Sequence, residues 1–438
     1  MILLVNPWIH DFAAYDLWMK PLGLLYLGGF LEQRGYPISL IDCLAEGVES
    51  SGPYNCGHFR SQVIAKPDCF SGIPRKYKRY GITPAELAGR LKALPSEPDL
   101  VLVTSMMTYW YTGVAEIIAV IRKAYPKSPI ALGGVYATLC AEHARRNSGA
   151  DYVITGPGEE QVLELVKTIG INPVSNTPNT ESYPAYHLYP GLKSAAMITS
   201  RGCPFRCSYC ASAELNDGYT CREPSQVIDE INYYISDLGV EDIAFYDDAL
   251  LFDSHKHIEP IIDGIISRGL NQKARFHTPN GLHISLIDKQ LAGKLCRAGF
   301  KTIRLGFESV SRQEDSSRKT ASADLPRTLG YLYQSGFKPV DVGVYVLMGL
   351  PGQALEEVDQ SIEFVHKSGG IIKMAQYAPV PGTPDFLKAA KELPQITAEP
   401  LLHNKSVYSC RMPGVGFDDL EAIKDKAKQL NSRLKPNT

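Results

Sequence analysis

The chain alternates short apolar segments with helical stretches, and this alternation occurs in two separate runs along its 438 residues. The strand-length segments of the first run span residues 1–5, 38–41, 100–104, 130–132 and 152–155. Strands that alternate with helices predict a parallel, doubly wound sheet covered by helices on both faces. Ligands of such sheets bind at the carboxyl ends of the strands, where Asn6, Ser105, Gly133 and Gly156 fall.

The second run contains six further segments of strand length, again separated by helical stretches. They span residues 195–199, 242–246, 274–277, 302–306, 342–347 and 372–377. Six strand–helix units predict a partial (β/α)6 barrel of the TIM type, whose chemistry belongs on the loops at the carboxyl ends of the strands. The expected fold class is therefore α/β, with a doubly wound parallel sheet followed by a partial barrel.

The boundary between the two runs has the composition of a linker. Residues 171–186 are rich in Pro, Asn, Ser and Thr. The expected organisation is a doubly wound domain over 1–170, a linker over 171–190, a barrel over 191–390 and a helical extension over 391–438. An insertion over residues 45–82 interrupts the pattern of the first domain.

Charge and composition argue against several classes of protein. The chain has 45 Lys and Arg against 47 Asp and Glu, so it lacks the basic excess of a nucleic-acid binder. No window approaches the roughly 18 apolar residues of a membrane span, and the N-terminus lacks the pattern of a secretory signal. We therefore expect a cytoplasmic protein, in which ten cysteines favour metal or redox chemistry over disulfides.

Three of the cysteines follow a C-x3-C-x2-C pattern on the loop after the first barrel segment: Cys203, Cys207 and Cys210. Thiolates this close in sequence can converge on one metal centre, and sulfur ligands select iron–sulfur clusters or zinc. A structural zinc site needs a fourth ligand at comparable spacing, but the next candidates are Cys221 and His255. Three thiolates on a four-iron cluster leave one iron open to a substrate or cofactor.

This motif, with the aromatic Tyr209 directly before the last cysteine, resembles the signature of the radical S-adenosylmethionine (SAM) superfamily. The resemblance implies a 4Fe-4S cluster whose open iron binds the amino and carboxylate groups of SAM. One electron from the cluster then cleaves SAM to a 5′-deoxyadenosyl radical, which the protein must shield from water. The resemblance also implies an electron donor such as flavodoxin or ferredoxin.

The ends of the second and third barrel strands supply further candidates. Asp247 and Asp248 stand where the superfamily often has a Gly-Gly-Glu motif, so we expect them to contact the SAM amino group. A helix N-cap is an equal alternative for each aspartate. His277 and Asn280, at the end of the third strand, are expected to face the substrate.

The fourth and fifth strands end in residues that resemble the family's nucleoside-binding positions. Glu308 and Ser309, at the end of the fourth strand, are candidates for the ribose hydroxyls. Arg318 follows in a polar loop and is a candidate for the SAM carboxylate, with a plain surface arginine as the alternative. Met348 ends the fifth strand, beside glycines that permit close backbone approach to an adenine.

A doubly wound domain ahead of such a barrel resembles the cobalamin-binding class of the superfamily. By this resemblance Ser105 lies near the nucleotide tail, and Gly133 and Gly134 leave room where that tail passes the backbone. The Asp-x-His-x-x-Gly motif of members that ligate cobalt through histidine is absent. We therefore expect that His10 does not ligate cobalt, and that Trp8 or water lies below the corrin. A domain that binds no cofactor is the alternative.

The resemblance is compatible with three functions. The first is cobalamin-dependent methylation of an unactivated carbon or phosphorus centre, with SAM as both radical source and methyl donor. The second is a cobalamin-dependent oxidoreductase or cyclase without net methyl transfer, and the third is a non-catalytic iron–sulfur and corrin-binding protein. A methylthiotransferase acting on transfer RNA is disfavoured, because Cys43, Cys56 and Cys69 are widely spaced for a second cluster. The substrate is expected to be a small molecule.

Overall fold

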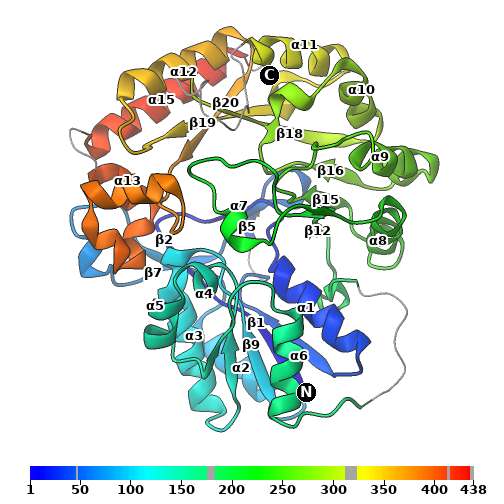
Figure 1. Cartoon of the computed structure of the whole chain (residues 1–438), viewed down its shortest axis with the longest axis vertical. Helices are drawn as coiled ribbons and strands as arrows, with labels where there is room; N and C mark the ends of the chain where they lie inside the picture. The colour runs from blue at the N-terminus through cyan, green and yellow to red at the C-terminus, as the bar shows by residue number, and fades with distance from the viewer. Residues whose placement is uncertain (46–47, 175–182, 311–322, 412–414, 435–438) are drawn as a thin grey trace. The chain divides into compact units, whose positions relative to one another are not determined.

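The computed structural model describes residues 1–45, 48–174, 183–310, 323–411 and 415–434. It divides into two compact units (Figure 1). The first unit comprises Met1–Gly191, Val380–Gly382 and Gln395–Asn404. The second comprises Leu192–Pro379, Thr383–Pro394 and Lys405–Thr438. Among the residues described, no helix has the length and apolar character needed to cross a membrane.

The first unit is built on a parallel sheet of five strands in the order β11-β10-β9-β1-β4. The strands are β1 (Ile2–Asn6), β4 (Ile38–Asp42), β9 (Leu100–Val103), β10 (Ile130–Leu132) and β11 (Tyr152–Val153). All five predicted strands are confirmed. Because β1 lies between β4 and β9, the direction of winding reverses beside β1, which makes the sheet doubly wound.

Helices cover both faces of this sheet. One face packs on α1 (Leu22–Gln33) and α6 (Glu159–Thr168); the other packs on α2 (Pro84–Lys92), α3 (Tyr111–Ala124), α4 (Val135–Leu139) and α5 (Ala141–Asn147). Alternate residues of β1 enter the two cores, with Leu3 and Val5 on one side and Ile2 and Leu4 on the other. This double burial explains why β1 is apolar from Ile2 to Val5.

The predicted insertion folds into two small antiparallel sheets together with the loop that follows β1. The first sheet has the order β2-β8-β7 and the second the order β3-β6-β5. Their strands are β2 (Ile9–Asp11), β3 (Tyr15–Asp16), β5 (Val48–Ser51), β6 (Gly57–Phe59), β7 (Ser61–Val63) and β8 (Lys78–Tyr80). The insertion is therefore ordered around the carboxyl end of β1.

A segment from late in the sequence, Gln395–Asn404, belongs to the first unit. His403 lies with Nδ1 2.9 Å from Thr108 Oγ1, and Asn404 Nδ2 donates to Asp11 at 2.9 Å. These contacts attach the segment to the end of β2 and to the turn that follows β9. The expected helical extension over 391–438 therefore includes a segment that packs with the first unit.

The second unit contains six parallel strands in the order β12-β15-β16-β18-β19-β20. They are β12 (Ser194–Met197), β15 (Asp242–Phe245), β16 (Arg275–His277), β18 (Phe300–Glu308), β19 (Val342–Met348) and β20 (Ile371–Gln376). All six predicted barrel strands are confirmed. Each strand pairs with its neighbour in sequence, and β12 and β20 do not pair in the part of the chain described. This order is that of a partial barrel.

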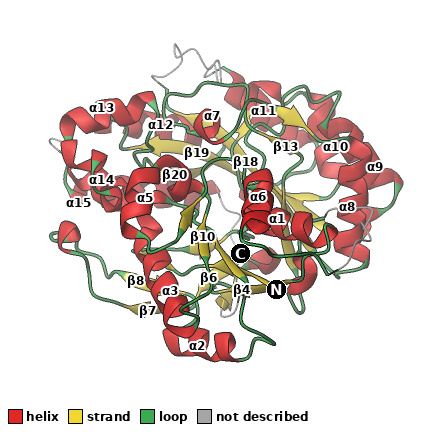
Figure 2. Ribbon diagram, turned by 60° about the horizontal axis from the view of Figure 1, so that its bottom comes forward, coloured by secondary structure: helices red, strands yellow, loops and turns green. Residues whose placement is uncertain are grey.

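Five helices connect these strands and lie outside them (Figure 2). They are α8 (Pro224–Ser236), α9 (Ile258–Ser267), α10 (Lys289–Arg297), α11 (Asp324–Gln334) and α12 (Leu355–Lys367). The terminal helix α15 (Phe417–Leu434) packs on α12 and β20. Asn431 of α15 bonds both the backbone N and O of Ile372. Shorter elements of this unit are α7 (Ser212–Leu215), β13 (Ser200–Arg201), β14 (Thr220–Cys221), β17 (Leu282–His283), α13 (Pro384–Glu392) and α14 (Lys405–Tyr408).

Candidate active site

The three cysteines of the motif lie on a loop, residues 202–210, which we call the cysteine loop. It follows the carboxyl end of β12, and the antiparallel pair β13–β14 precedes and follows it. Gly202 opens the loop with a φ of +75°, and a Cβ at this position would lie 1.9 Å from the carbonyl oxygen of Gly218. Only glycine fits there, so the start of the loop is fixed by close backbone packing.

Cys207 is buried, Cys203 is partly buried and Cys210 is exposed, and none forms a disulfide. A turn in which Cys210 N donates to Cys207 O at 3.1 Å brings two of them into one bend. In the part of the chain described, no three His, Cys, Asp or Glu side chains are grouped as a metal site. The thiols nevertheless form the donor set that an iron–sulfur cluster requires. Ligation by these cysteines stays a prediction from their spacing.

Asp247, which follows β15, holds the backbone that leads into the cysteine loop. Its Oδ1 accepts hydrogen bonds from the backbone N and the hydroxyl of Thr199, at 2.9 and 2.7 Å, and from the same two groups of Ser200, both at 2.6 Å. The side chain is buried, and burial raises the pKa of its carboxyl group. Oδ1 of Asp247 thus accepts four hydrogen bonds from the two residues that lead into the loop. Contact between Asp247 and the SAM amino group stays a prediction.

His257, which sequence reasoning did not identify, extends this network. Its Nε2 lies 2.8 Å from Thr199 Oγ1, and burial lowers the pKa of its imidazole. No periodicity or motif in the sequence distinguishes His257, because its role depends on a partner 58 residues away.

Asp248, the second predicted aspartate, is exposed, and its carboxylate accepts a hydrogen bond from Ser212 Oγ of α7 at 2.5 Å.

Tyr209 and Glu308 join the cysteine loop to the end of β18. The Tyr209 hydroxyl donates to Glu308 Oε1. Burial and the neighbouring carboxylate raise the pKa of Tyr209 far above its ordinary value, so the phenol stays protonated. Glu308 adopts a φ of +72°, a conformation that costs a non-glycine residue free energy and is often found at functional sites. The structure thus brings together two residues that the sequence singled out separately.

The remaining predicted SAM contacts have varied surroundings. Ser309 is buried and its hydroxyl donates to Glu357 of α12. Met348 is fully buried at the end of β19. The loop that follows is held by Gln353, whose Oε1 accepts from the backbone N of Gly349 at 2.9 Å. Arg318 lies outside the described residues.

Two histidines and an asparagine near the third strand have structural partners. The prediction that His277 faces the substrate is wrong: it is fully buried, with Nε2 2.9 Å from Asp242 and Nδ1 3.1 Å from Thr302. Asn280 donates to the backbone oxygen of Tyr246 at 2.8 Å. His283 stacks on Phe205 of the cysteine loop with ring centroids 4.4 Å apart.

The predicted nucleotide-tail residues of the first unit lie together at the carboxyl ends of β9 and β10. Ser105 Oγ donates to the carbonyl oxygen of Gly133 at 2.7 Å. Gly134 has a φ of +94°, and a Cβ there would lie 2.3 Å from Ser105 O. At Gly133 a Cβ would meet nothing closer than 4.0 Å. Glycine at 134 is therefore required by the chain itself, whereas a side chain at 133 would meet no close neighbour, and a role for Gly133 beside the nucleotide tail stays a prediction.

The loop after β1 differs from the expectation for the lower corrin face. Trp8 is 1% exposed and belongs to the apolar core of the first unit, so the expectation that it lies below the corrin is wrong. His10 is also buried, with Nδ1 3.1 Å from Thr112 Oγ1 and Nε2 3.1 Å from Glu116 Oε2. Both ring nitrogens of His10 thus have neighbours on α3.

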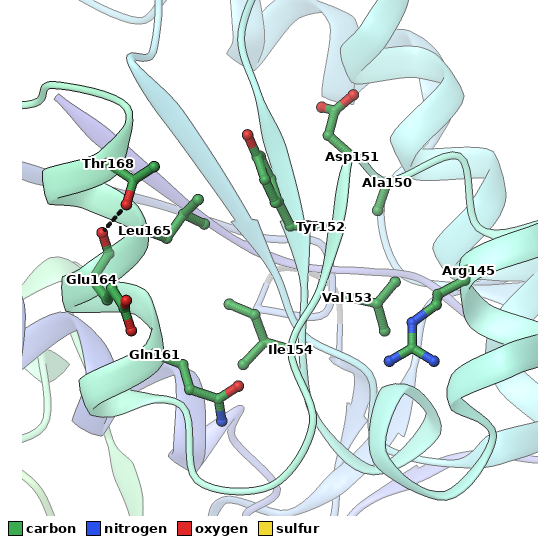
Figure 3. Close-up of a pocket in the computed structure, with 10 residues that line it drawn as sticks. All are labelled: Arg145, Ala150, Asp151, Tyr152, Val153, Ile154, Gln161, Glu164, Leu165 and Thr168. Carbon is green, nitrogen blue, oxygen red and sulfur yellow. Dashed lines mark hydrogen bonds between the residues drawn. The ribbon is translucent and has the colours of Figure 1, made fainter.

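A separate cavity of about 630 Å³ lies at the edge strand β11. Figure 3 shows Arg145 of α5 on one side of the strand and Gln161 and Glu164 of α6 on the other. Tyr152 on the strand is 40% exposed. None of the predicted site residues lines this cavity.

Comparison with known proteins agrees with this arrangement. Residues 197–365 match the model of the radical SAM superfamily, and residues 80–166 match the B12 binding domain. A solved structure of the radical SAM methyltransferase TsrM from Kitasatospora setae, with cobalamin and a 4Fe-4S cluster bound, has a TM-score of 0.66. Its sequence is 17% identical, and the match covers 99% of this chain and 89% of TsrM.

Curated relatives include enzymes of two kinds. Cytidylyl-2-hydroxyethylphosphonate methyltransferase from Streptomyces wedmorensis is 20% identical over 439 residues, covering 84% of this chain and 77% of the relative. Anaerobic magnesium-protoporphyrin IX monomethyl ester cyclase from Cereibacter sphaeroides is 23% identical over 339 residues, covering 69% of this chain. The match spans only about half, 54%, of the cyclase.

The cysteine loop lies in a unit of parallel strands and helices, and a doubly wound sheet precedes it. Together with the two matches, these features indicate a radical SAM enzyme with a B12-binding domain. The chain thus combines a region that matches the radical SAM superfamily, residues 197–365, with a region that matches the B12 binding domain, residues 80–166. Its cofactors are a 4Fe-4S cluster, SAM and cobalamin. It is related both to methyltransferases and to a cyclase.

Proposed function

We propose that the protein is a cobalamin-dependent methyltransferase that acts on an unactivated carbon or phosphorus centre of a small molecule. When bound, the cluster and SAM supply a 5′-deoxyadenosyl radical, and cobalamin supplies the methyl group. The proposal rests on the match to the phosphonate methyltransferase, which extends over 84% of this chain and 77% of that enzyme. The cyclase match covers only 54% of the cyclase. A cytoplasmic location and an electron donor such as flavodoxin or ferredoxin belong to the same proposal.

The residues of the second unit have defined tasks in this proposal. Cys203, Cys207 and Cys210 bind three irons of the cluster. Asp247 orients the cysteine loop through its hydrogen bonds to Thr199 and Ser200. All three side chains are buried, so water is excluded from the segment that leads into the loop.

The nucleoside of SAM is assigned to residues around the ends of β18 and β19, and its carboxylate is assigned to Arg318, which lies outside the described residues. Glu308, which accepts a hydrogen bond from Tyr209, is assigned to the ribose hydroxyls. Ser309, Arg318 and Met348 complete the proposed contacts. In the first unit, Ser105 and the glycine pair line the path of the corrin's nucleotide tail.

The test uses protein reconstituted anaerobically with iron, sulfide and cobalamin, reduced, and incubated with SAM labelled in its methyl group. The expected result is label in the corrin fraction together with one equivalent of S-adenosylhomocysteine. Absence of both products from protein that holds cluster and corrin would contradict methyl transfer.

Cyclase-type chemistry is the second candidate, and the match to the magnesium-protoporphyrin ester cyclase favours it. It predicts 5′-deoxyadenosine and methionine without S-adenosylhomocysteine. A protein that binds cluster and corrin but releases neither nucleoside product is the non-catalytic alternative. The three outcomes are separated by one chromatographic analysis of the SAM-derived products.

A further inference from the structure

Helix α13 makes a direct connection to the middle of the cysteine loop. It begins at Pro384, after Thr383, whose side chain accepts from Phe386 N at 3.2 Å and so serves as the N-cap. Asp385, in the first turn, is fully buried. Because Thr383 already caps the helix, helix capping does not account for a carboxylate at position 385.

Asp385 instead forms hydrogen bonds with Ser208, one of the two residues between the proposed cluster ligands Cys207 and Cys210. Its Oδ2 accepts from Ser208 Oγ at 2.9 Å, and its backbone N donates to Ser208 O, also at 2.9 Å. Ser208 is the residue between Cys207 and Tyr209. The loop is therefore held to α13 by a side-chain bond and a backbone bond at the same residue.

The charge of Asp385 is balanced by Lys388, whose Nζ lies 2.9 Å from Oδ1. Burial of a carboxylate is unfavourable unless its oxygens have donors, and here both oxygens have one. The bond to Ser208 has an ionised acceptor, a class of hydrogen bond stronger than a neutral one. Its loss would remove the side-chain bond between Asp385 and Ser208 and keep the backbone bond between the same two residues.

We propose that Asp385 is a positioning residue that fixes the Cys207–Cys210 segment, and with it the orientation of the cluster and its open iron. The inference rests on the proposed ligation of a cluster by the three cysteines. Asp247 bonds the chain before the loop, Asp385 bonds Ser208 within it, and Glu308 bonds Tyr209. Three carboxylates, one after β15, one in α13 and one at the end of β18, thus bond the chain before the loop and two successive residues within it.

The experiment compares wild type, Ser208→Ala, Asp385→Ala and Asp385→Asn, each reconstituted anaerobically with iron, sulfide and cobalamin. SAM is titrated into the reduced protein, and the change in the cluster's electron paramagnetic resonance (EPR) spectrum gives the apparent Kd. We expect Ser208→Ala and Asp385→Ala to keep wild-type iron content but to weaken SAM binding about tenfold, the effect of one charge-assisted hydrogen bond. Asp385→Asn, whose amide oxygen still accepts from Ser208, is expected within about twofold of wild type.

Two controls separate positioning from folding. Leu387→Ala alters a 64% exposed side chain on the same helix and is expected to leave the titration unchanged. The double variant Ser208→Ala/Asp385→Ala is expected to bind SAM as well as either single variant does, because each substitution removes the same hydrogen bond. If Asp385→Ala does not fold, Ser208→Ala decides the question.

Unchanged spectra and SAM titrations in Ser208→Ala and in folded Asp385→Ala would overturn the positioning role. Additive losses in the double variant would also overturn it. Failure of wild type itself to bind a cluster would instead contradict the proposed ligation, so the two failures are distinguishable.

Discussion

The two candidate sites of this protein are held in place by different kinds of interaction. The cysteine loop is held by buried carboxylates that accept hydrogen bonds from the loop or from the residues just before it: Asp385 accepts from Ser208, and Asp247 accepts from Ser200. The region around Ser105 is held by close backbone approach, with Gly134 against the serine's own carbonyl. A flexible loop between strands needs polar contacts to become rigid, whereas a short turn between a strand and a helix is already constrained by its backbone.

This difference predicts different responses to substitution. At the cysteine loop, single side-chain changes should alter chemistry and SAM binding while leaving the fold intact. At the glycine pair, a single added methyl group should alter folding or corrin binding, depending on which glycine receives it.

The largest expected effect is that of Cys207→Ala. Removal of one member of a group that acts as a unit abolishes most of the rate, so formation of 5′-deoxyadenosine should fall at least about a thousandfold. Corrin retention in gel filtration should be unchanged, because the corrin is assigned to the other unit. The matched control is Cys221→Ala, an exposed cysteine on β14, which should keep wild-type cleavage. Equal loss in both variants would contradict the assignment of the three ligands.

Gly134→Ala should have the next largest effect. The added Cβ would lie 2.3 Å from Ser105 O at a φ of +94°, and such strain and overlap cost about 3 kcal/mol or more. The measurement is urea unfolding followed by tryptophan fluorescence. All three tryptophans, Trp8, Trp18 and Trp110, belong to the first unit, so this signal reports on that unit.

Gly133→Ala is the control for Gly134→Ala, because its Cβ would meet nothing closer than 4.0 Å. It should unfold as wild type does but retain less corrin. Normal corrin retention in Gly133→Ala would contradict the proposed path of the nucleotide tail.

The stability of the first unit should depend on pH through His403. Burial lowers the pKa of His403 from 6.5 to about 4, so between these values the unfolded chain binds a proton that the folded chain does not. Stability is full above pH 6.5 and is lost as the pH falls toward 4, by up to about 3 kcal/mol. His403→Gln should remove this contribution to the fluorescence-detected transition. An equal pH dependence in the variant would contradict the role of His403.

Tyr209→Phe should have the smallest effect of the four. The substitution removes the hydroxyl that donates to Glu308 and keeps the ring, so the apparent Kd for SAM should rise about tenfold. Cluster content should stay at the wild-type level. Loss of the cluster in Tyr209→Phe would show that this pair supports assembly of the site rather than SAM binding.

The strands could be predicted from the sequence, because strands buried on both faces are continuous apolar runs. The signature of the cysteine loop was equally visible, since its ligands lie within eight residues. Side-chain partnerships across long separations could not be predicted: the donors to Asp247 lie 47 and 48 residues away, and Ser208 lies 177 residues from Asp385. The Thr-Pro pair at 383–384 was the available signal for α13.

Two wrong expectations have a common physical cause. His277 and Trp8 lie near strand ends, where ligands of parallel sheets bind, but each side chain is directed into the interior. Position along a strand indicates which end a residue occupies. It does not reveal on which side of the sheet the side chain lies when both faces are buried.

The proposed function depends on a SAM-cleaving cluster in the cysteine loop. The most direct test is EPR spectroscopy of the anaerobically reconstituted, reduced protein before and after addition of SAM, with analysis of the nucleoside products. The expected result is the signal of a reduced 4Fe-4S cluster that shifts when SAM binds, accompanied by nucleoside products derived from SAM. A protein that takes up zinc but no iron, or a cluster signal that SAM does not change, would contradict it.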